Sequence, residues 1–395
     1  MPRTIADVVA KLPSPPIREL PAPPYDPVPC GEEPEEAGLR PPGKWNWHER
    51  KVGLAVESMR RHTTDEGWQL FAGLHFAGYS LAGYGLITTD GWNISIRRWS
   101  SAERHGDMTD VPEILEFIDP SVVVLQDKRE WEGLTAGGPY GQGYDEREKF
   151  TNVEELKRRN DVFKLTVLKD AQNRPEYHRQ SADEIGCHAW ITYYHPKVVK
   201  HVAPFVREKH LVRTYHSIDM DLVPEYEGVE RLPRCLLSGA LSRAYPLRER
   251  IHKNRGSFPL VVELSHPGYH RRGCHTPDYL KILSNYRAAI CTSSIYGYAL
   301  RKIIEATACG CKVITDLPTD EVLPEIDGNL IRIDPDAPTA VINQVMEQAV
   351  EEYNPDEQAC WAECAGMYDY RLLGKKLAGD IESMRLAVRE ESAAR

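Results

Sequence analysis

The sequence predicts an α/β protein with two Rossmann-like, doubly wound domains that face a cleft, preceded by a proline-rich N-terminal arm. Short apolar runs alternate with helical patterns at the spacing of β-α-β units, which favours parallel sheets covered by helices. This alternation occurs twice, once on each side of residues 221–232, which we interpret as a linker. The length of 395 residues suits two domains of nearly 200 residues.

Composition excludes several classes of protein. Hydrophobic residues make up 41% of the chain and charged residues 27%, as in ordinary globular proteins. No run of about 18 apolar residues is present, so we expect no transmembrane helix. The N-terminus has no apolar signal core, and nine cysteines indicate reduced thiols, so we expect a cytoplasmic protein. A net charge of −10 argues against broad nonspecific binding to nucleic acid.

The first predicted segment is the arm, residues 1–47. It holds 12 of the 29 prolines and few aliphatic residues. We therefore expect it to be extended or disordered.

The N-terminal domain is predicted to span residues 48–220. An apolar run at 68–74 precedes a glycine-rich stretch, and a helix at 111–118 stops before Pro120. The near-continuous apolar run 121–126 is typical of a strand buried on both faces. Three further pairs follow: helices at 153–159, 177–185 and 196–207, and strands at 162–168, 188–194 and 211–216.

The C-terminal domain is predicted to span residues 233–375, and a C-terminal helix is predicted over residues 376–395. The helical pattern itself is seen over 370–388. The predicted strands are 234–239, 259–264, 287–292 and 311–315, and the predicted helices are 279–284, 299–308 and 338–353.

The segment 287–330 carries the strongest chemical signal. A strand leads through a Gly/Ser/Thr loop into a helix, and the free N–H groups at a helix N-terminus suit a diphosphate. Arg301 and Lys302 add positive charge in the first turn. Glu305 lies one turn on, and one carboxylate can accept hydrogen bonds from both hydroxyls of a ribose.

Residues 301–310 (RKIIEATACG) resemble the (R)xxxEAxACG helix of GT-B glycosyltransferases, most closely the group-1 type with a CgeB/YkvP-like C-terminal domain. Residues 237–248 (LSGALSRAYPLR) are similar to the first strand and loop of that domain. The resemblance covers about 230–375 and implies a nucleotide-sugar donor as co-substrate, with 48–220 as the acceptor domain. It implies these donor-binding residues: Gly239, Ser242, Arg243, Tyr298, Arg301, Lys302 and Glu305.

One position departs from the family pattern. Many retaining members carry two glutamates with seven residues between them, and the first would fall at position 297, which is Gly297 here. Glu305 carries over as the ribose ligand, but the sugar-contacting glutamate does not. Arginine side chains and a helix N-terminus can stabilise a leaving diphosphate, so we expect neither a metal nor another cofactor.

An inverting reaction needs a base, and two residues are candidates. His75 follows an apolar run, and Asp127 follows the strand 121–126, so both would lie at the carboxyl end of a strand. The alternative for His75 is a packed or capping histidine, and the alternative for Asp127 is a salt bridge within a loop. Residues 215–219 end the last strand of this domain and are a further candidate for the cleft lining.

Three other functions stay open. The protein could glycosylate a hydroxymethylated base in DNA, although its acidity weighs against this. The Trp92–Trp99 stretch, with Arg97 and Arg98, is the one local hint of a polymeric acceptor. It could also be a nucleotide-sugar 2-epimerase or a noncatalytic sugar-nucleotide-binding protein. A zinc site in residues 266–275 is disfavoured because Pro-Gly and Arg-Gly interrupt the histidines and Cys274 adjoins His275.

Overall fold

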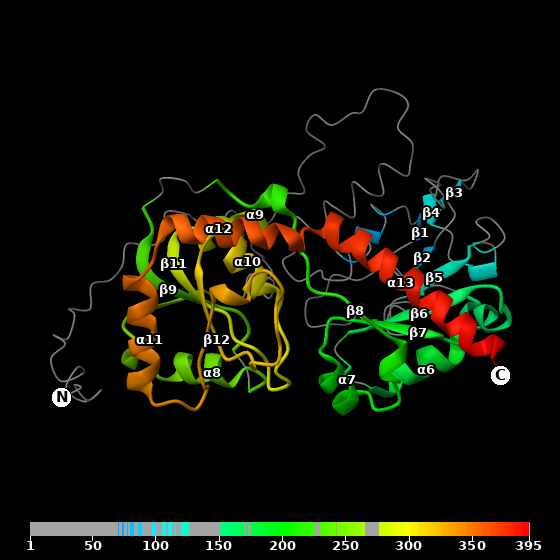
Figure 1. Cartoon of the computed structure of the whole chain (residues 1–395), viewed down its shortest axis with the longest axis horizontal. Coiled ribbons are helices and arrows are strands. Elements are labelled where there is room, and N and C mark those ends of the chain that lie inside the picture. The colour runs from blue at the N-terminus through cyan, green and yellow to red at the C-terminus, as the bar shows by residue number, and fades with distance from the viewer. Residues whose placement is uncertain are drawn as a thin grey trace, which may run out of the picture. The chain divides into compact units, whose positions relative to one another are not determined.

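The chain forms two compact units, shown in Figure 1. Unit 1 contains Asp219–Met367, and unit 2 contains Asp65–Ile218 together with Tyr368–Arg395. The computed structural model describes residues 70, 73–74, 77, 80–82, 86–88, 97–99, 105–107, 110–112, 115, 120–125, 151–169, 171–172, 175–225, 230–241, 243–264 and 276–394. The proline-rich arm and residues 266–275 lie outside the described residues.

Unit 1 is built on a parallel sheet of five strands in the order β10-β9-β11-β12-β13. The chain starts in β9, moves outward to β10, and then returns past β9 to β11. This order makes β9 and β11 neighbours whose connections leave in opposite directions. The strands are β9 (Leu232–Ser238), β10 (Val261–Leu264), β11 (Tyr286–Ile290), β12 (Lys312–Thr315) and β13 (Leu330–Arg332).

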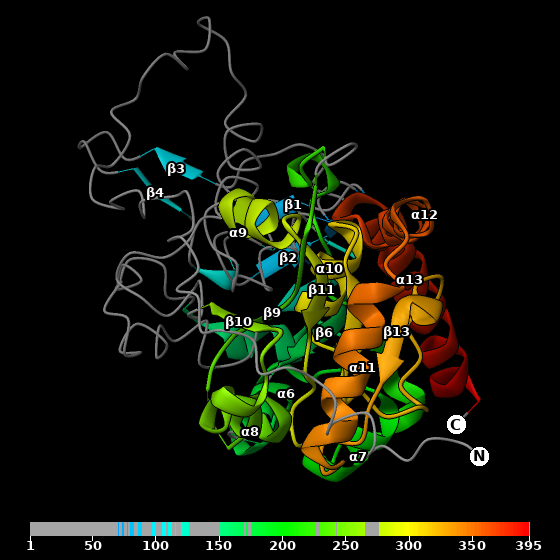
Figure 2. The ribbon, with the colours of Figure 1, turned by 90° about the vertical axis from the view of Figure 1, so that its left-hand side faces the viewer.

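Helices cover both faces of this sheet (Figures 1 and 2). Helices α8 (Pro246–Lys253) and α11 (Thr339–Glu351) share one apolar core with the strands, through buried residues such as Leu247 and Met346. The other face carries α9 (Thr276–Leu283), α10 (Arg301–Ala308) and α12 (Pro355–Ala365). Unit 1 is therefore doubly wound, as the sequence predicts.

Unit 2 contains a six-stranded sheet in the order β1-β2-β5-β6-β7-β8. The strands from β5 to β8 are parallel, as predicted, but β1 and β2 run antiparallel to their neighbours. Only three residues separate β1 from β2, and so short a connection returns the chain as a hairpin. The strands are β1 (Ser80–Ala82), β2 (Leu86–Thr88), β5 (Val122–Leu125), β6 (Phe163–Leu168), β7 (Ala189–Thr192) and β8 (Leu211–Arg213); β3 (Arg97–Trp99) and β4 (His105–Asp107) form a separate ribbon.

The strand β5 confirms the prediction of burial on both faces. Val122 and Val124 join a core that includes Leu377 of α13 (Tyr370–Ala393). Val123 and Leu125 join a second core, on the side of α6 (Pro175–Ile185). Alternate side chains of one strand therefore anchor two helical layers.

Several elements differ from the sequence-based expectation. The helix predicted at 153–159 is the 3₁₀ helix η3 (Val153–Arg158), whose last carbonyls are met by a side chain: Lys164 Nζ donates to Leu156 O at 3.0 Å and to Arg159 O at 2.9 Å. The helix predicted at 196–207 is α7 (Pro196–Val202), because Pro204 disfavours helix at the residue before it. Helices α8 and α12 and strand β13 were not predicted.

Candidate functional site

The carboxyl edge of the unit 1 sheet carries the strongest candidate site. In doubly wound sheets, ligands bind where adjacent strands send their connections to opposite sides. Strands β9 and β11 are this pair in unit 1. Ser238 and Gly239 leave β9 at this edge, and the loop from Cys291 to Leu300 leaves β11.

The turn after β9 lies against a buried arginine. Gly239 has a φ of +123°, and a Cβ at this position would lie 2.3 Å from Nη1 of Arg248. Arg248 belongs to the first turn of α8 and is only 1% exposed. Its Nη1 donates to Ala240 O at 3.0 Å, and its guanidinium stacks over the ring of Tyr245, 4.3 Å from the centroid. Among the described residues, Nε and Nη2 of Arg248 have no hydrogen-bond partner.

The loop after β11 is fixed to its neighbours by backbone contacts. The N–H of Ser293 donates to Asp316 Oδ1, which follows β12, and the N–H of Ile295 donates to Ala244 O at 2.9 Å. Burial raises the pKa of the Asp316 carboxyl. Thr292 Oγ1 is buried and has no hydrogen-bond partner in the described part of the chain. The loops after β9, β11 and β12 therefore form one connected, polar edge.

Gly297 lies in this loop and explains the departure from the two-glutamate pattern. Its φ is +64°, and a Cβ there would lie 2.8 Å from Cγ of Pro318. A side chain at position 297 therefore meets both backbone strain and a steric clash.

Helix α10 presents two adjacent cations in different electrostatic states. Nε of Arg301 lies 2.8 Å from Oε1 of Glu305, and both side chains are buried. Lys302 is partly exposed, and its Nζ lies 3.4 Å from Ser238 Oγ and 3.5 Å from Tyr279 OH. Burial lowers the pKa of the Lys302 ammonium to about 8.

Arg248 and Lys302 make this edge suitable for a multiply charged anion. Neither forms an ion pair with a carboxylate among the described residues, although the charge of Asp316 acts on Arg248 and that of Glu305 acts on Lys302 through space. Buried cations are normally paired, and an unpaired one is costly unless a ligand supplies the partner. The described residues contain no cluster of His, Cys, Asp or Glu able to hold a metal ion, and no helix with the length and apolarity of a membrane span.

The structure gathers five of the predicted donor residues at or beside this edge. The turn after β9 holds Gly239, and helix α10 holds Arg301, Lys302 and Glu305. Tyr298 is buried in the loop before α10. Arg243 lies in the loop after β9 and is exposed. Ser242, His75 and Asp127 lie outside the described residues. The described residues of the run before His75, which are 70, 73 and 74, are helical, so the strand predicted to end at His75 is wrong.

Sequence reasoning missed Arg248 and Tyr279. Arg248 ends the segment 237–248, whose pattern predicts a strand and a loop. The signal that could have found it is Pro246, because proline favours the first position of a helix and would place Arg248 in the first turn. Tyr279 has no comparable signal, since it reaches Ser238 across 41 residues of sequence.

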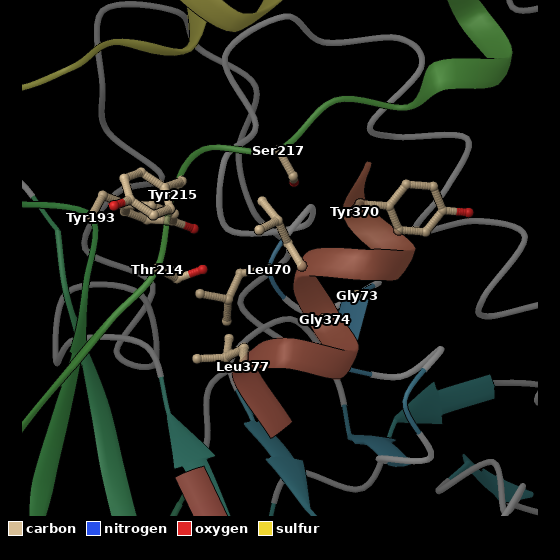
Figure 3. Close-up of a pocket in the computed structure, with 10 residues that line it drawn as sticks. Leu70, Gly73, Tyr193, Thr214, Tyr215, Ser217, Tyr370, Gly374 and Leu377 are labelled. Atoms are coloured by element: carbon tan, nitrogen blue, oxygen red, sulfur yellow. The ribbon is translucent and has the colours of Figure 1, made fainter. Parts of the chain in front are cut away.

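Unit 2 contains a small cavity where α13 packs on the sheet (Figure 3). Its volume of about 10 Å³ holds one water molecule, so it marks a packing seam and not a substrate pocket. Tyr215 and Ser217, from the predicted cleft segment, line it, and His216 stacks on Tyr193 at 4.4 Å between ring centroids. The full lining is Leu70, Gly73, Tyr193, Thr214, Tyr215, Ser217, Tyr370, Leu373, Gly374 and Leu377.

Comparison with known proteins gives structural neighbours only. The sequence matches no protein-family model and no curated protein. The pneumococcal O-GlcNAc transferase GtfA, in complex with UDP and GlcNAc, is 14% identical with a TM-score of 0.38, over 59% of this chain and 54% of GtfA.

Two further neighbours cover more of their own length. Anabaena Alr3699/HepE, in complex with UDP and glucose, is 13% identical with a TM-score of 0.41, over 56% of this chain and 72% of that one. A glycosyltransferase from Rickettsia africae is 9% identical with a TM-score of 0.43, over 69% of this chain and 79% of that one. This chain thus spans about half of GtfA and about three quarters of the other two proteins. At these identities and TM-scores, the likenesses assign no family and no activity to the chain.

Proposed function

We propose that this protein is a glycosyltransferase that moves a sugar from a nucleotide-sugar donor to an acceptor hydroxyl. The observation that carries the proposal is the meeting of Arg248 and Lys302, two cations without an ion-pair partner among the described residues, where β9 and β11 diverge. The diphosphate of a nucleotide sugar supplies two negative charges for them. The helix that resembles the glycosyltransferase motif carries Lys302 itself.

In the proposed reaction the bond between the sugar C1 and the diphosphate oxygen breaks, and C1 bonds to the acceptor oxygen. The acceptor proton passes to a base, and negative charge grows on the departing diphosphate. In this proposal Arg248 and Lys302 stabilise that charge, so the transfer does not depend on a metal ion.

Glu305 remains our proposal for the ribose of the donor. Its Oε1 is paired with Arg301, which fixes the direction of the carboxylate and leaves Oε2 for the two ribose hydroxyls. His75 and Asp127 remain the proposed bases on the acceptor side. The absence of a side chain at Gly297 supports a mechanism without the sugar-contacting glutamate.

Thermal melting with a panel of ligands tests the proposal. We expect UDP, GDP, ADP or CDP, or a corresponding nucleotide sugar, to raise the melting temperature of the wild-type protein. A ligand at 100 times its Kd adds about 2.7 kcal/mol to the free energy of unfolding. Arg248→Met should abolish this shift, because it removes one of the two cations that we propose to contact the phosphates.

Arg255→Met is the matched control. Arg255 lies in η6 (Arg255–Ser257), which precedes β10 at the opposite edge of the sheet, and its side chain is exposed. This variant removes the same charge and should keep the ligand shift. If no nucleotide stabilises the wild-type protein, the proposal is wrong. Conversion of a bound nucleotide sugar to its epimer without an acceptor would identify an epimerase, and binding without any turnover a noncatalytic protein.

A further inference from the structure

We propose that Ser238 and Tyr279 are positioning residues that hold Lys302 for the diphosphate of the donor. This inference rests on the proposed function. Ser238 ends β9, Tyr279 belongs to the first turn of α9, and Lys302 belongs to the first turn of α10. Three elements that are distant in sequence therefore converge on one ammonium group.

The side chains of Ser238 and Tyr279 surround Nζ of Lys302, and we call this pair the cradle. Ser238 Oγ and Tyr279 OH lie 2.7 Å apart and share a hydrogen bond. Lys302 Nζ lies within 3.4 Å of the first oxygen and 3.5 Å of the second, and 4.7 Å from the centroid of the tyrosine ring. Tyr279 is completely buried, so its ring and hydroxyl have a fixed place.

The hydrogen inventory leaves one donor for a ligand. An ammonium group has three N–H donors, and each hydroxyl retains lone pairs after the shared hydrogen bond. Two of the N–H groups can therefore donate to Ser238 and Tyr279, and the third remains for a phosphate oxygen. The hydroxyls are neutral, so they orient the ammonium without cancelling its charge.

Arg301 provides the contrast within the same helix turn. Its guanidinium is paired with the Glu305 carboxylate, whereas Lys302 is held by a neutral pair and a ring. A paired cation attracts an anion weakly, because its field is already compensated. The cradle thus keeps one cation oriented but electrostatically available.

The pH at which Lys302 loses its proton reports how well Ser238 and Tyr279 stabilise the ammonium form. The ionisable groups that act on it are Glu305 and Arg301 on α10, Arg248 on α8 and Cys291 after β11. Burial lowers its pKa to about 8, while the pKa of Tyr279 is raised by burial, so the phenol stays protonated. A diphosphate binds the ammonium form, so its affinity should fall as the pH rises through 8.

Calorimetric titration of the full chain with inorganic pyrophosphate and with UDP, between pH 6.5 and 9.5, tests the inference. Tyr279→Phe keeps the ring and removes one acceptor of the ammonium, so we expect about tenfold weaker binding at neutral pH. Losing that acceptor disfavours the ammonium, so the midpoint of the affinity loss should also move to lower pH. Lys302→Met should bind weakly with no such midpoint.

Tyr353→Phe is the matched control. It also removes a tyrosine hydroxyl with a hydrogen bond in unit 1, in this case to Gly310 O at 3.2 Å. Gly310 precedes β12, at the opposite edge of the sheet, so affinity and midpoint should both stay as in the wild type. If Tyr279→Phe does not fold, Ser238→Ala replaces it with the same expectation.

The outcomes separate this inference from the proposed function. Wild-type affinity in Tyr279→Phe, or weaker binding with an unchanged midpoint, would overturn the positioning role. If pyrophosphate binds and the midpoint moves but UDP and the other nucleotides do not bind, the cradle stands and the donor assignment is wrong. If the wild type binds none of these ligands, both proposals are wrong.

Discussion

At the scale of single residues, the buried charge of Lys302 should destabilise the protein when no ligand is bound. Its pKa is 10.5 in a model peptide and about 8 in the fold. The unfolded chain therefore holds a proton that the folded chain lacks between these values, so stability falls as the pH drops from 10.5 to 8 and then levels off. We expect Lys302→Met to raise the free energy of unfolding by about 1–3 kcal/mol at pH 7.

Chemical denaturation at pH 7 and at pH 10.5 measures this effect, which should shrink towards the higher pH. Lys253→Met is the control, because Lys253 is an exposed lysine of α8 paired with Glu249. Its removal should change stability by less than about 0.5 kcal/mol at either pH. A Lys302→Met protein that is less stable than the wild type at pH 7 would contradict the expectation.

The glycine at position 297 gives a second residue-scale prediction. Gly297→Ala should lower the free energy of unfolding by about 1–3 kcal/mol, because of its positive φ and the contact with Pro318. Gly256→Ala is the control, since nothing lies within 4 Å of a Cβ at that position. Equal effects in thermal melts of the two variants would show that the loop accommodates a side chain.

Some contacts of the candidate site are local in sequence and could be predicted, and others join distant segments and could not. Arg301, Lys302 and Glu305 share one helix, so a linear motif predicts that they gather. Tyr279 and Ser238 meet across 41 residues, and that contact depends on which strand lies beside β9. The sequence pattern shows that strands exist but does not determine their order in the sheet.

At the scale of elements, the C-terminal helix packs on unit 2 through a backbone contact. A Cβ on Gly374 of α13 would lie 2.0 Å from Gly73 O, and backbone atoms cannot move aside as a flexible side chain can. Gly374→Ala should therefore lower the free energy of unfolding by about 1–3 kcal/mol. Gly379→Ala, in the same helix with nothing within 4 Å of a Cβ, should raise it by up to about 1 kcal/mol.

Urea denaturation followed by circular dichroism distinguishes the two variants. A loss of stability in Gly379→Ala as large as in Gly374→Ala would attribute the effect to the helix itself and not to its packing. The contact with Gly73 could not be predicted, because nothing in the pattern of 370–388 states which sheet the helix covers. The central strands could be predicted, because their apolar runs reflect burial on both faces.

At the scale of the whole molecule, the two units should differ in their ability to fold alone. Every described residue of the candidate site lies between Ser238 and Asp316, inside unit 1. We expect residues 219–367 to melt cooperatively as an isolated fragment and to bind pyrophosphate. Residues 65–218 alone should not melt cooperatively, because Leu377 and Ile381 of α13 complete the core of unit 2.

Adding a peptide of residues 368–395 should restore a cooperative transition to the 65–218 fragment. In the described part of the chain, the Ile218 N–H donates to Tyr368 O at 3.0 Å and the Tyr370 N–H donates to Ile218 O at 2.9 Å. Lys209 Nζ also donates to Glu391 Oε2 of α13. Calorimetry of the separate and mixed fragments measures the effect. A cooperative transition in 65–218 without the peptide would contradict the dependence on α13.

The interleaving of the two units has a consequence for biosynthesis. The ribosome makes the sheet of unit 2 first, but its completing helix emerges only after all of unit 1 has been translated. During that interval the apolar surface that α13 covers is exposed in the nascent chain, while unit 1 can already fold as it leaves the exit tunnel. The half of the protein that is synthesised second is therefore the half that matures first, and premature termination within α13 should yield chains that chaperones and proteases recognise.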